Sequence, residues 1–335
     1  MDMKKIRIAQ IGTGHLHAGA CFKTLRNRPD IFEVVGIAEP VPERVCRLTE
    51  RAVYKDIPVY TAEEILAMED LDAVTIETDE VYLTKYALAA AERGLHVHMD
   101  KPGGIELEDF EKLIATAKKN KTIVHLGYMY RYNPYVQQML EEAKRGEFGD
   151  IFSVEAQMSG HVDVELRQWL KTFPGGMMFF LGCHLIDLLL LFRGQPDEII
   201  PLNRVTGHDG LDSTDYGMVV FNYPNGISFA KSNASEIGGF TRRQLVVCGT
   251  KKTVELKPFE TLVEGGQVTD KTEYLTEAWF EKGEPSQTPV FDRYDAMMEA
   301  FAKMAAGEKE NPFTLDYELQ LYRTILKSCG VEIPE

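Results

Sequence analysis

The sequence predicts an α/β protein with two domains, a doubly wound parallel sheet followed by an α+β domain with a large, mostly antiparallel, open-faced sheet. Residues 5–126 alternate short apolar runs with amphipathic helical patterns, as βαβ units do. After about residue 127, apolar and polar residues alternate as they do in antiparallel strands. We therefore expect one domain over residues 1–126 and a second over residues 127–335.

The parallel strands of the first domain are expected in KIRIAQI, FEVVGIA, DAVTIE, HVHM and TIVHLG. Two helices between them are expected at Val81–Arg93 and Leu107–Lys119, where apolar residues recur every three or four positions. Gly94 follows the first of these helices as a C-cap. Such helices would cover the faces of the sheet and leave the carboxyl ends of its strands open to a ligand.

The second domain is expected to build its sheet from FSVEAQMS, YGMVVFNY, GISFAKSNAS, RQLVVCGT and KTVELKP. YPNG at 223–226 predicts a hairpin turn between two of these strands, because Asn225 and Gly226 tolerate positive φ. Further helices are predicted at Asn133–Arg145, Arg293–Ala306 and Leu315–Ser328.

The composition is that of an acidic globular protein. Hydrophobic residues make up 44% and charged residues 27% of the chain, which is ordinary globular usage. The formal net charge of -15 repels phosphate backbones and anionic membrane surfaces. We expect neither a nucleic-acid partner nor a membrane partner.

Three features of the sequence favour a cytoplasmic location: its start, its apolar runs and its cysteines. The start MDMKKIRIAQIG enters a glycine motif without the apolar region of a signal peptide. The longest apolar run, Met177 to Phe192, is shorter than a membrane span. The five cysteines are widely spaced without a CxxC pair, which argues against a disulfide framework or a zinc cluster: Cys21, Cys46, Cys183, Cys248 and Cys329.

A glycine-rich turn follows the first predicted strand in IRIAQIGTGHLH. Here a turn must be tight and backbone amides must approach a pyrophosphate at a helix N-terminus, as in the dinucleotide-binding fingerprint of the Rossmann fold. His17 replaces the third glycine of that fingerprint. We interpret His15 and His17 as facing solvent or the cofactor, and we expect no metal site. The residues of the turn expected to bind the dinucleotide are Gly12, Thr13, Gly14, His15 and Leu16.

Glu39 closes the second predicted strand, EVVGIA, about twenty residues after the glycine turn. A carboxylate at this position can accept both ribose hydroxyls of the adenosine, which favours NAD over NADP. The alternative is a solvated carboxylate at a strand end, which is common.

Five segments in a fixed order resemble the glucose-fructose oxidoreductase, inositol dehydrogenase and MocA (Gfo/Idh/MocA) family. They are GTGHLHAG, HVHMDKPGG, GYMYRYNP, PGGMMFFLGCHLID and PFTLDYELQLY, and they extend over nearly the whole chain. The family typically has Glu-Lys-Pro where this chain has Asp100, Lys101 and Pro102. The resemblance implies a Rossmann domain that holds NAD(P), a second domain for substrate binding and oligomerisation, and a cis Pro102.

Lys101 lies at a predicted strand end that faces the cofactor crevice. An ammonium there can polarise a carbonyl or stabilise a developing alkoxide, so we expect Lys101 to be catalytic. Asp100, Pro102 and Thr78 are expected beside the cofactor. The alternative for Lys101 is a surface lysine in a loop.

His184 is the second predicted catalytic residue. Its apolar neighbours alone favour an ordinary core histidine, but the resemblance implies an acid or base that meets the lysine over the nicotinamide. Asp187, three residues further on, could orient the imidazole or act as a structural hydrogen-bonding group.

The sequence departs from the family pattern at two positions. Most members carry an aspartate four residues before the histidine, where this chain has Phe180. A phenyl ring can neither relay a proton nor accept a hydrogen bond, so it adds an apolar wall and indicates a different substrate shape. Asp79 replaces the usual proline after Thr78, which indicates an unusual loop on the nicotinamide side.

Further polar and aromatic residues of the second domain are weaker candidates for the substrate pocket. Each of them is more often a packing residue than a ligand contact. They are Tyr130, Arg131, His161, Arg167, Trp169 and Asp187.

Together these features predict an NAD(P)-dependent dehydrogenase or reductase that transfers a hydride between nicotinamide and a CH–OH carbon of a small polyol, sugar or sugar derivative. One alternative is a glycoside-cleaving enzyme that uses tightly bound NAD for transient oxidation. Another is a silent nucleotide-binding regulatory protein. The apolar runs VVF, ISFA and LVVC also predict a homodimer or homotetramer through the second domain's sheet.

Overall fold

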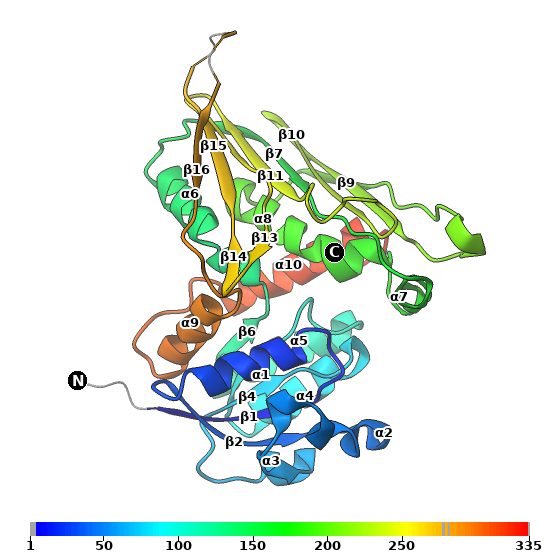
Figure 1. Ribbon diagram of the computed structural model, residues 1–335, viewed down its shortest axis with the longest axis vertical. Helices are drawn as coiled ribbons and strands as arrows, with labels where there is room; N and C mark the ends of the chain where they lie inside the picture. Colours follow the sequence, from blue (N-terminus) through cyan, green and yellow to red (C-terminus); the bar gives the residue numbers. More distant parts are fainter. Residues whose placement is uncertain (1–4, 277–278, 281, 334–335) are drawn as a thin grey trace. The chain divides into compact units, whose positions relative to one another are not determined.

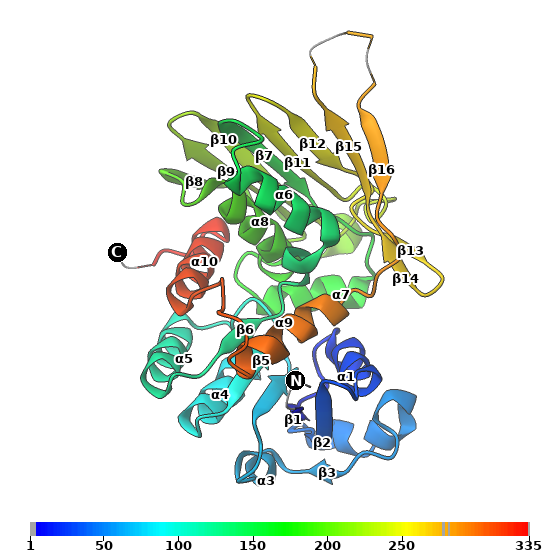
Figure 2. The same cartoon turned by 90° about the vertical axis from the view of Figure 1, so that its left-hand side faces the viewer.

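The computed structural model describes residues 5–276, 279–280 and 282–333. The chain forms two compact units, drawn in Figures 1 and 2. Unit 1 comprises Met1–Tyr128 and Tyr294–Tyr322, and unit 2 comprises Met129–Arg293 and Arg323–Glu335. The sequence-based division after residue 126 assigns Tyr294–Tyr322 to the second domain, whereas here this segment packs with the first unit.

Unit 1 contains a six-stranded parallel sheet in the order β3-β2-β1-β4-β5-β6. The order reverses between β1 and β4, which is the arrangement of a Rossmann fold and leaves a crevice at the carboxyl ends of those two strands. The five strands predicted from sequence are confirmed, and the two-residue β3 is an addition too short for a periodic signal. The strands are β1 (Ile6–Ile11), β2 (Phe32–Ala38), β3 (Val59–Tyr60), β4 (Ala73–Ile76), β5 (His96–Met99) and β6 (Val124–Leu126).

Helices cover both faces of this sheet, because right-handed crossovers leave β1 and β4 in opposite directions. The helix α1 packs on α9, and α4 packs on α5. The helices are α1 (Ala18–Asn27), α2 (Pro42–Val45), α3 (Ala62–Leu66), α4 (Glu80–Glu92), α5 (Leu107–Asn120), α9 (Asp295–Ala305) and the first half of α10 (Leu315–Ser328), with 3₁₀ turns at Leu48–Glu50 and Ala52–Tyr54.

Unit 2 contains an eight-stranded sheet in the order β16-β15-β12-β11-β7-β10-β9-β8. It is antiparallel except for the pair of β7 and β10, whose strands run parallel. Pro224 and Asn225 form the predicted hairpin turn between β9 and β10. The strands are β7 (Ile151–Gln157), β8 (Glu198–Pro201), β9 (Tyr216–Tyr223), β10 (Gly226–Asn233), β11 (Gln244–Gly249), β12 (Thr253–Leu256), β15 (Asp270–Tyr274) and β16 (Glu284–Gln287), with a separate hairpin of β13 (Thr261–Val263) and β14 (Gly266–Val268).

The helix α8 (Cys183–Arg193) packs against β7 and β10 and is buried almost all round. A π-helical turn at Met178–Gly182 leads into it. Along β9 and β10 buried residues alternate with more exposed ones, so one face of the sheet is covered and the other is open. The other helical segments of the unit are α6 (Pro134–Lys144), α7 (Val164–Trp169) and 3₁₀ turns at Met129–Tyr132, Leu170–Thr172 and His208–Gly210.

The two sheets with their helices confirm the predicted fold class. Among the described residues, none of the helices combines the length and the apolar character needed to span a bilayer.

Candidate functional site

The glycine turn between β1 and α1 lies at the reversal point of the sheet in unit 1. Gly12 has a φ of +94°, which only glycine adopts without strain. A Cβ on Gly12 would lie 2.6 Å from the backbone nitrogen of Thr78, closer than real Cβ atoms come to other atoms. Glycine is therefore required for the turn to pass close to the Thr78 main chain, and a tight glycine turn before a helix N-terminus fits a dinucleotide's pyrophosphate.

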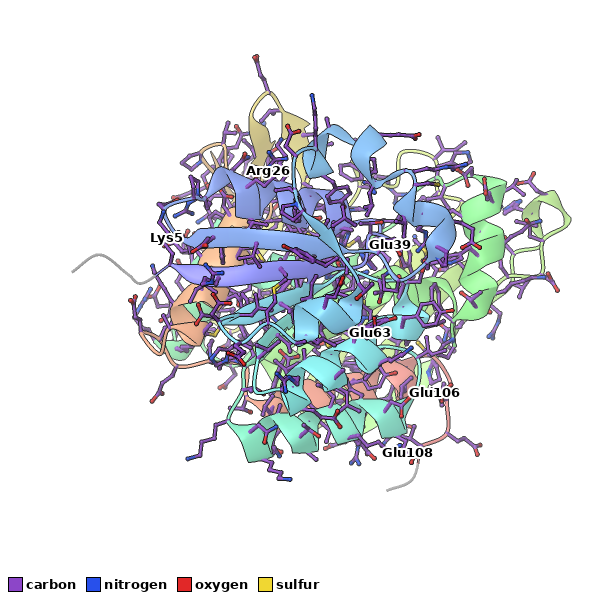
Figure 3. All side chains as sticks on the ribbon, turned by 90° about the horizontal axis from the view of Figure 1, so that it is seen from below. Lys5, Arg26, Glu39, Glu63, Glu106 and Glu108 are labelled. Atoms are coloured by element: carbon purple, nitrogen blue, oxygen red, sulfur yellow. The ribbon has the colours of Figure 1, made fainter. Side chains whose placement is uncertain are left out.

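Glu39 lies directly after β2 and binds the glycine turn. Its Oε2 accepts hydrogen bonds from the backbone nitrogen of Thr13, at 2.8 Å, and from the Thr13 hydroxyl. Its Oε1 accepts from the backbone nitrogen of Val41 at 2.9 Å. Figure 3 shows Glu39 and Lys5 at opposite ends of the parallel strands, which places Glu39 at the carboxyl edge.

A cavity of about 390 Å³ adjoins Glu39 within the same unit. Val45 and Val59 contribute apolar walls to it, and Tyr60 contributes an aromatic ring. Glu63 and Glu64 also line this cavity, so its wall is partly apolar and partly acidic.

An ion pair between Arg44 and Asp79 lies against Gly14. The two side chains make a bidentate contact, with Nη1 to Oδ2 at 2.6 Å and Nη2 to Oδ1 at 2.8 Å. A Cβ on Gly14 would lie 2.8 Å from the carboxyl carbon of Asp79. The aspartate that replaces the family's proline thus has a partner, and the pair brings a guanidinium to the glycine turn.

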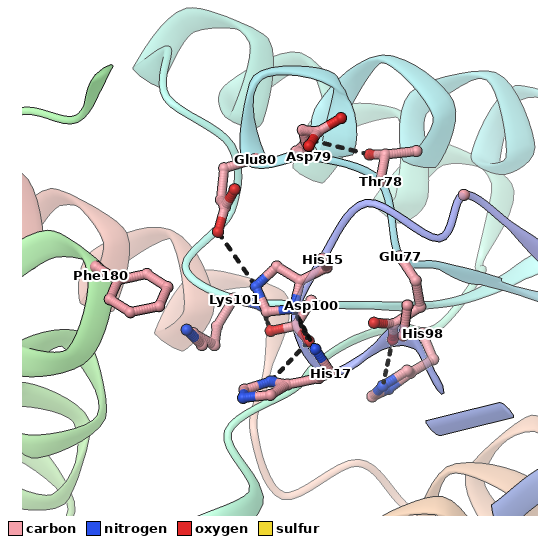
Figure 4. A network of polar contacts seen from close by, with 12 residues as sticks. His15, His17, Glu77, Thr78, Asp79, Glu80, His98, Asp100, Lys101 and Phe180 are labelled. Carbon is pink, nitrogen blue, oxygen red and sulfur yellow. Dashed lines mark hydrogen bonds and ion pairs between the residues drawn. The ribbon is translucent and has the colours of Figure 1, made fainter. Parts of the chain in front are cut away.

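His15 lies between two carboxylates and is 4% exposed. Its Nδ1 is 2.8 Å from Asp100 Oδ2, and its Nε2 is 3.2 Å from Glu80 Oε1 (Figure 4). Burial by itself lowers the pKa of His15, but these carboxylates raise it to about 10. The side chain is therefore a buried imidazolium and does not face solvent, while its neighbour Leu16 is 65% exposed.

Asp100 is the centre of this cluster. Burial favours its neutral form, but His15 and His17 hold the pKa of Asp100 well below its usual range. His17 Nδ1 lies 3.0 Å from Asp100 Oδ2, and burial lowers the pKa of His17 to about 4. Asp100 Oδ1 also accepts a hydrogen bond from the backbone nitrogen of Lys101 at 2.7 Å.

Lys101 follows β5 at the carboxyl edge of the sheet and is 2% exposed. The Lys101–Pro102 peptide bond is cis, as the family resemblance implied. Burial excludes the interpretation of Lys101 as a surface lysine. The predicted positions of Asp100, Lys101, Pro102 and Thr78 at the strand ends of unit 1 agree with the structure.

His184 lies in the first turn of α8 in unit 2 and is 2% exposed. The Tyr130 ring meets it edge-on, with ring centroids 4.9 Å apart and an angle of 88° between the planes. The Tyr130 hydroxyl donates to Glu260 Oε2 at 2.6 Å, and Arg243 and Arg293 form ion pairs with the same carboxylate at 2.6 and 2.8 Å. The ring of Tyr130 is thus held against His184 by a buried charge network.

Arg131 and Asp187, a residue of α8, form a buried bidentate pair. Nε lies 2.9 Å from Oδ2 and Nη2 lies 2.8 Å from Oδ1, and the side chains of both residues are at most 2% exposed. Of the two roles considered for Asp187, this contact favours the structural one. The pair holds the helix that carries His184, and substrate contact by either residue stays a prediction.

Phe180 belongs to an aromatic cluster in unit 2. Trp169 meets it edge-on at 5.3 Å, and Phe173 is stacked parallel to it at 6.3 Å. Phe180 is thus packed among aromatic rings, and its role as an apolar wall of the substrate site stays a prediction. Of the remaining substrate candidates, His161 is exposed, and Arg167 is buried in an ion pair with Asp209.

Sequence reasoning missed several polar residues that the structure buries in these two regions. Glu77 ends the predicted strand DAVTIE and His98 lies within HVHM, and a polar side chain in a strand that should be buried on both faces is the signal which could have found them. Glu80, Glu260 and Arg243 gave no such signal, because their partners are distant in the sequence.

Two family models match the chain. Residues 6–128 match the model GFO_IDH_MocA, described as an oxidoreductase family with an NAD-binding Rossmann fold. Residues 136–255 match the C-terminal domain of the same family.

Individual relatives are distant. An uncharacterized oxidoreductase of Rhizobium meliloti is 22% identical over 324 residues, 95% of this chain and 94% of the relative. D-xylose 1-dehydrogenase (NADP(+)) 2 of Haloferax volcanii is 27% identical over 51% of this chain and 54% of its own length. A mutant of a 3-ketoreductase from Actinomadura kijaniata, solved with TDP-benzene and NADP, shares the fold with a TM-score of 0.77 at 18% identity, covering 99% of this chain and 100% of that one.

Proposed function

Because this chain belongs to the Gfo/Idh/MocA family of NAD(P)-dependent oxidoreductases, we propose that it transfers a hydride at a CH–OH carbon of a small polyol, sugar or sugar derivative. The observation that carries the proposal is Lys101, buried beside Asp100 and the glycine turn at the carboxyl edge of the Rossmann sheet. When bound, the nicotinamide supplies the hydride acceptor or donor.

Lys101 has the role of binding and stabilising the substrate oxygen. Its backbone nitrogen donates to the Asp100 carboxylate, which helps to hold the strand end from which the Lys101 side chain extends. In the oxidation direction it stabilises the negative charge that develops on oxygen as the hydroxyl proton leaves.

His184 has the role of acid or base. It takes the hydroxyl proton in oxidation and returns it in reduction, so the carbon–oxygen single bond becomes a carbonyl and back. Tyr130 packs on the imidazole, and the Arg131–Asp187 pair holds the helix that carries it. These contacts support a fixed imidazole rather than a freely rotating one.

NAD is the proposed cofactor. Glu39 is suited to accept hydrogen bonds from the ribose hydroxyls and would repel a 2′-phosphate. Arg44 is five residues further on and is engaged by Asp79, which reduces the attraction it could offer to that phosphate. The relatives that are named with NADP make Glu39→Ser the informative variant, which should raise the ratio of NADP to NAD activity about tenfold.

The experiment that tests the function is a panel of polyols, sugars and sugar derivatives assayed with NAD and with NADP at the absorbance band of the reduced nicotinamide. Turnover of at least one substrate that is lost in Lys101→Ala supports the proposal. Dinucleotide binding without turnover across the panel would contradict it.

The two alternatives are not favoured. The named relatives include dehydrogenases and reductases, and no contact in the described residues singles out glycoside cleavage or a silent regulatory role. A cytoplasmic location stays a prediction from the sequence.

We further propose a homodimer or homotetramer through the open face of the sheet in unit 2. Val220 and Phe229 are paired neighbours on that face, and Ile227 is 55% exposed. Apolar groups on an open sheet face are suited to a second copy of the sheet. Light scattering should report an oligomer for the natural chain and a smaller species for Phe229→Glu.

A further inference from the structure

Three buried side chains from separate elements of unit 1 bring a sulfur, an oxygen and a nitrogen together. Cys21 lies on α1, Glu77 follows β4 and His98 lies on β5. Their potential ligand atoms all lie within 4.8 Å of one another, and none of the three residues is more than 1% exposed. We propose that these residues bind a divalent transition-metal ion, with Zn²⁺ as the ion whose ligand preference they match.

The surroundings of Glu77 are an independent reason for a cation. Both carboxylate oxygens are buried, and among the described residues neither has a hydrogen-bond partner. Nε2 of His98 is 3.9 Å from Glu77 Oε1 (Figure 4), which is too long for a hydrogen bond. A buried carboxylate without donors is costly, and a bound cation removes that cost.

The orientation of His98 also suits a metal ligand. Its Nδ1 lies 2.8 Å from Nδ1 of His125, so that nitrogen is engaged and Nε2 is the one directed to Glu77. His125 is itself stacked on Phe301, with ring centroids 5.5 Å apart. A second residue that holds the far nitrogen of a ligating histidine is a regular feature of zinc sites.

A second group in the same unit, His15, His17 and Asp100, also has the composition of a metal site. Its charges are already compensated, because His15 is an imidazolium between Asp100 and Glu80. In the Cys21, Glu77 and His98 group the ion pair is looser, with His98 Nε2 at 3.9 Å from Glu77 Oε1, and this is the group to which the geometry assigns the ion.

A metal ion there would link α1, the helix after the glycine turn, to the ends of β4 and β5. The three groups are sealed from solvent, so the ion would stabilise unit 1 and would not meet the substrate. This assignment departs from the expectation that no metal binds, because the three ligands are too widely spaced in the sequence to form a recognisable motif.

The test uses the full chain, stripped with a chelator and then loaded with Zn²⁺ or Co²⁺. We expect about one Zn²⁺ per chain by elemental analysis, and a near-ultraviolet thiolate charge-transfer band with Co²⁺. Cys21→Ser should lose that band, whereas Cys46→Ser, which removes the exposed cysteine of the same unit, should keep it. His17→Ala should also keep the thiolate band, because His17 belongs to the other group, with His15 and Asp100.

Glu77→Gln keeps the side-chain shape and serves if Cys21→Ser does not fold. It should lower the affinity for Zn²⁺ by about tenfold or more and reduce the rise in melting temperature that Zn²⁺ causes. Three results would overturn the assignment: no metal retained by the natural chain after loading, a thiolate band that persists in Cys21→Ser, or metal binding that is lost only in His17→Ala.

Discussion

Two buried glutamates, one in each unit, have opposite surroundings. Glu260 in unit 2 is 1% exposed and meets two guanidinium groups and a phenol within 2.8 Å. Glu77 in unit 1 is fully buried, and neither of its oxygens has a hydrogen-bond partner among the described residues. Positively charged side chains of unit 2 already neutralise the carboxylate of Glu260. The carboxyl group of Glu77 lacks such partners and is suited to bind a cation.

The same contrast extends to the groups around them. In unit 2 the buried charges pair with charges of opposite sign, as in Arg131 with Asp187. At the sheet edge of unit 1, His15 and Asp100 have strongly shifted pKa values and lie next to Lys101. Shifted titratable groups gathered at a crevice are typical of a functional site, and matched ion pairs are typical of a scaffold.

The largest expected effect is on turnover. Lys101→Ala and His184→Asn should each lower kcat/KM by about 10²- to 10³-fold, because the proposed mechanism gives each of them a role at the substrate oxygen. The double variant should lose less than the product of the two effects if both act in one step. Lys112→Ala, which removes an exposed lysine of unit 1, is the matched control. If the double variant lost the full product of the two single effects on kcat/KM, the two residues would act independently, which would contradict a shared step.

The next effect is on stability in unit 2. Asp187→Asn leaves the Arg131 guanidinium buried without its counter-charge, so the free energy of unfolding should fall by about 3–5 kcal/mol. Urea denaturation measures the loss. Glu108→Gln, which breaks an exposed pair with Lys112, should leave the urea midpoint unchanged. An equal shift of the urea midpoint in both variants would contradict the expectation that the buried ion pair matters more than the exposed one.

The two glutamates can be compared directly by the same substitution. Glu260→Gln removes the charge that neutralises Arg243 and Arg293, and should lower the free energy of unfolding by about 3 kcal/mol. In chelator-treated protein, burial raises the pKa of Glu77 well above its usual range, so Glu77→Gln replaces a neutral carboxyl group and should change the free energy of unfolding by less than about 1 kcal/mol. Equal destabilisation by the two substitutions would remove the contrast between the units.

The smallest effect is a pH dependence at Tyr130. Burial raises the pKa of Tyr130 from 10.0 to about 12, despite the opposing positive charge of Arg293 and Arg243. The unfolded chain therefore loses this proton first as pH rises, and the free energy of unfolding falls between pH 10 and 12. The natural chain should lose about 1 kcal/mol more than Tyr130→Phe between pH 9 and pH 11. Identical pH profiles would contradict the raised pKa.

Much of the first unit could be predicted because its signals are local. The glycine turn, Glu39 and Lys101 each directly follow a strand. In a parallel sheet the carboxyl ends of all strands lie at the same edge, so these residues are expected to lie close together. The cluster around His15 could not be predicted, because Glu80 and Asp100 come from different loops. Their effect on the pKa of His15 depends on distances that spacing in the sequence does not set.

The second unit shows a similar division. The alternating runs of β9 and β10 and the turn between them were readable, since periodicity and turn chemistry are properties of short segments. The parallel pairing of β7 with β10, the short strands β13 to β16, and the network around Glu260 were not. Which strands pair across a long sequence separation depends on the packing of the whole unit, and no short segment encodes it.

By itself, the sequence determined the two layered architectures and the family, because periodicity, glycine placement and strand-end motifs act within a few residues of one another. Only the tertiary structure decided that Tyr294–Tyr322 packs with unit 1, that His15 is an imidazolium, and that Cys21, Glu77 and His98 meet. Burial and charge are set by which distant segments touch, and that contact exists only once the chain has folded.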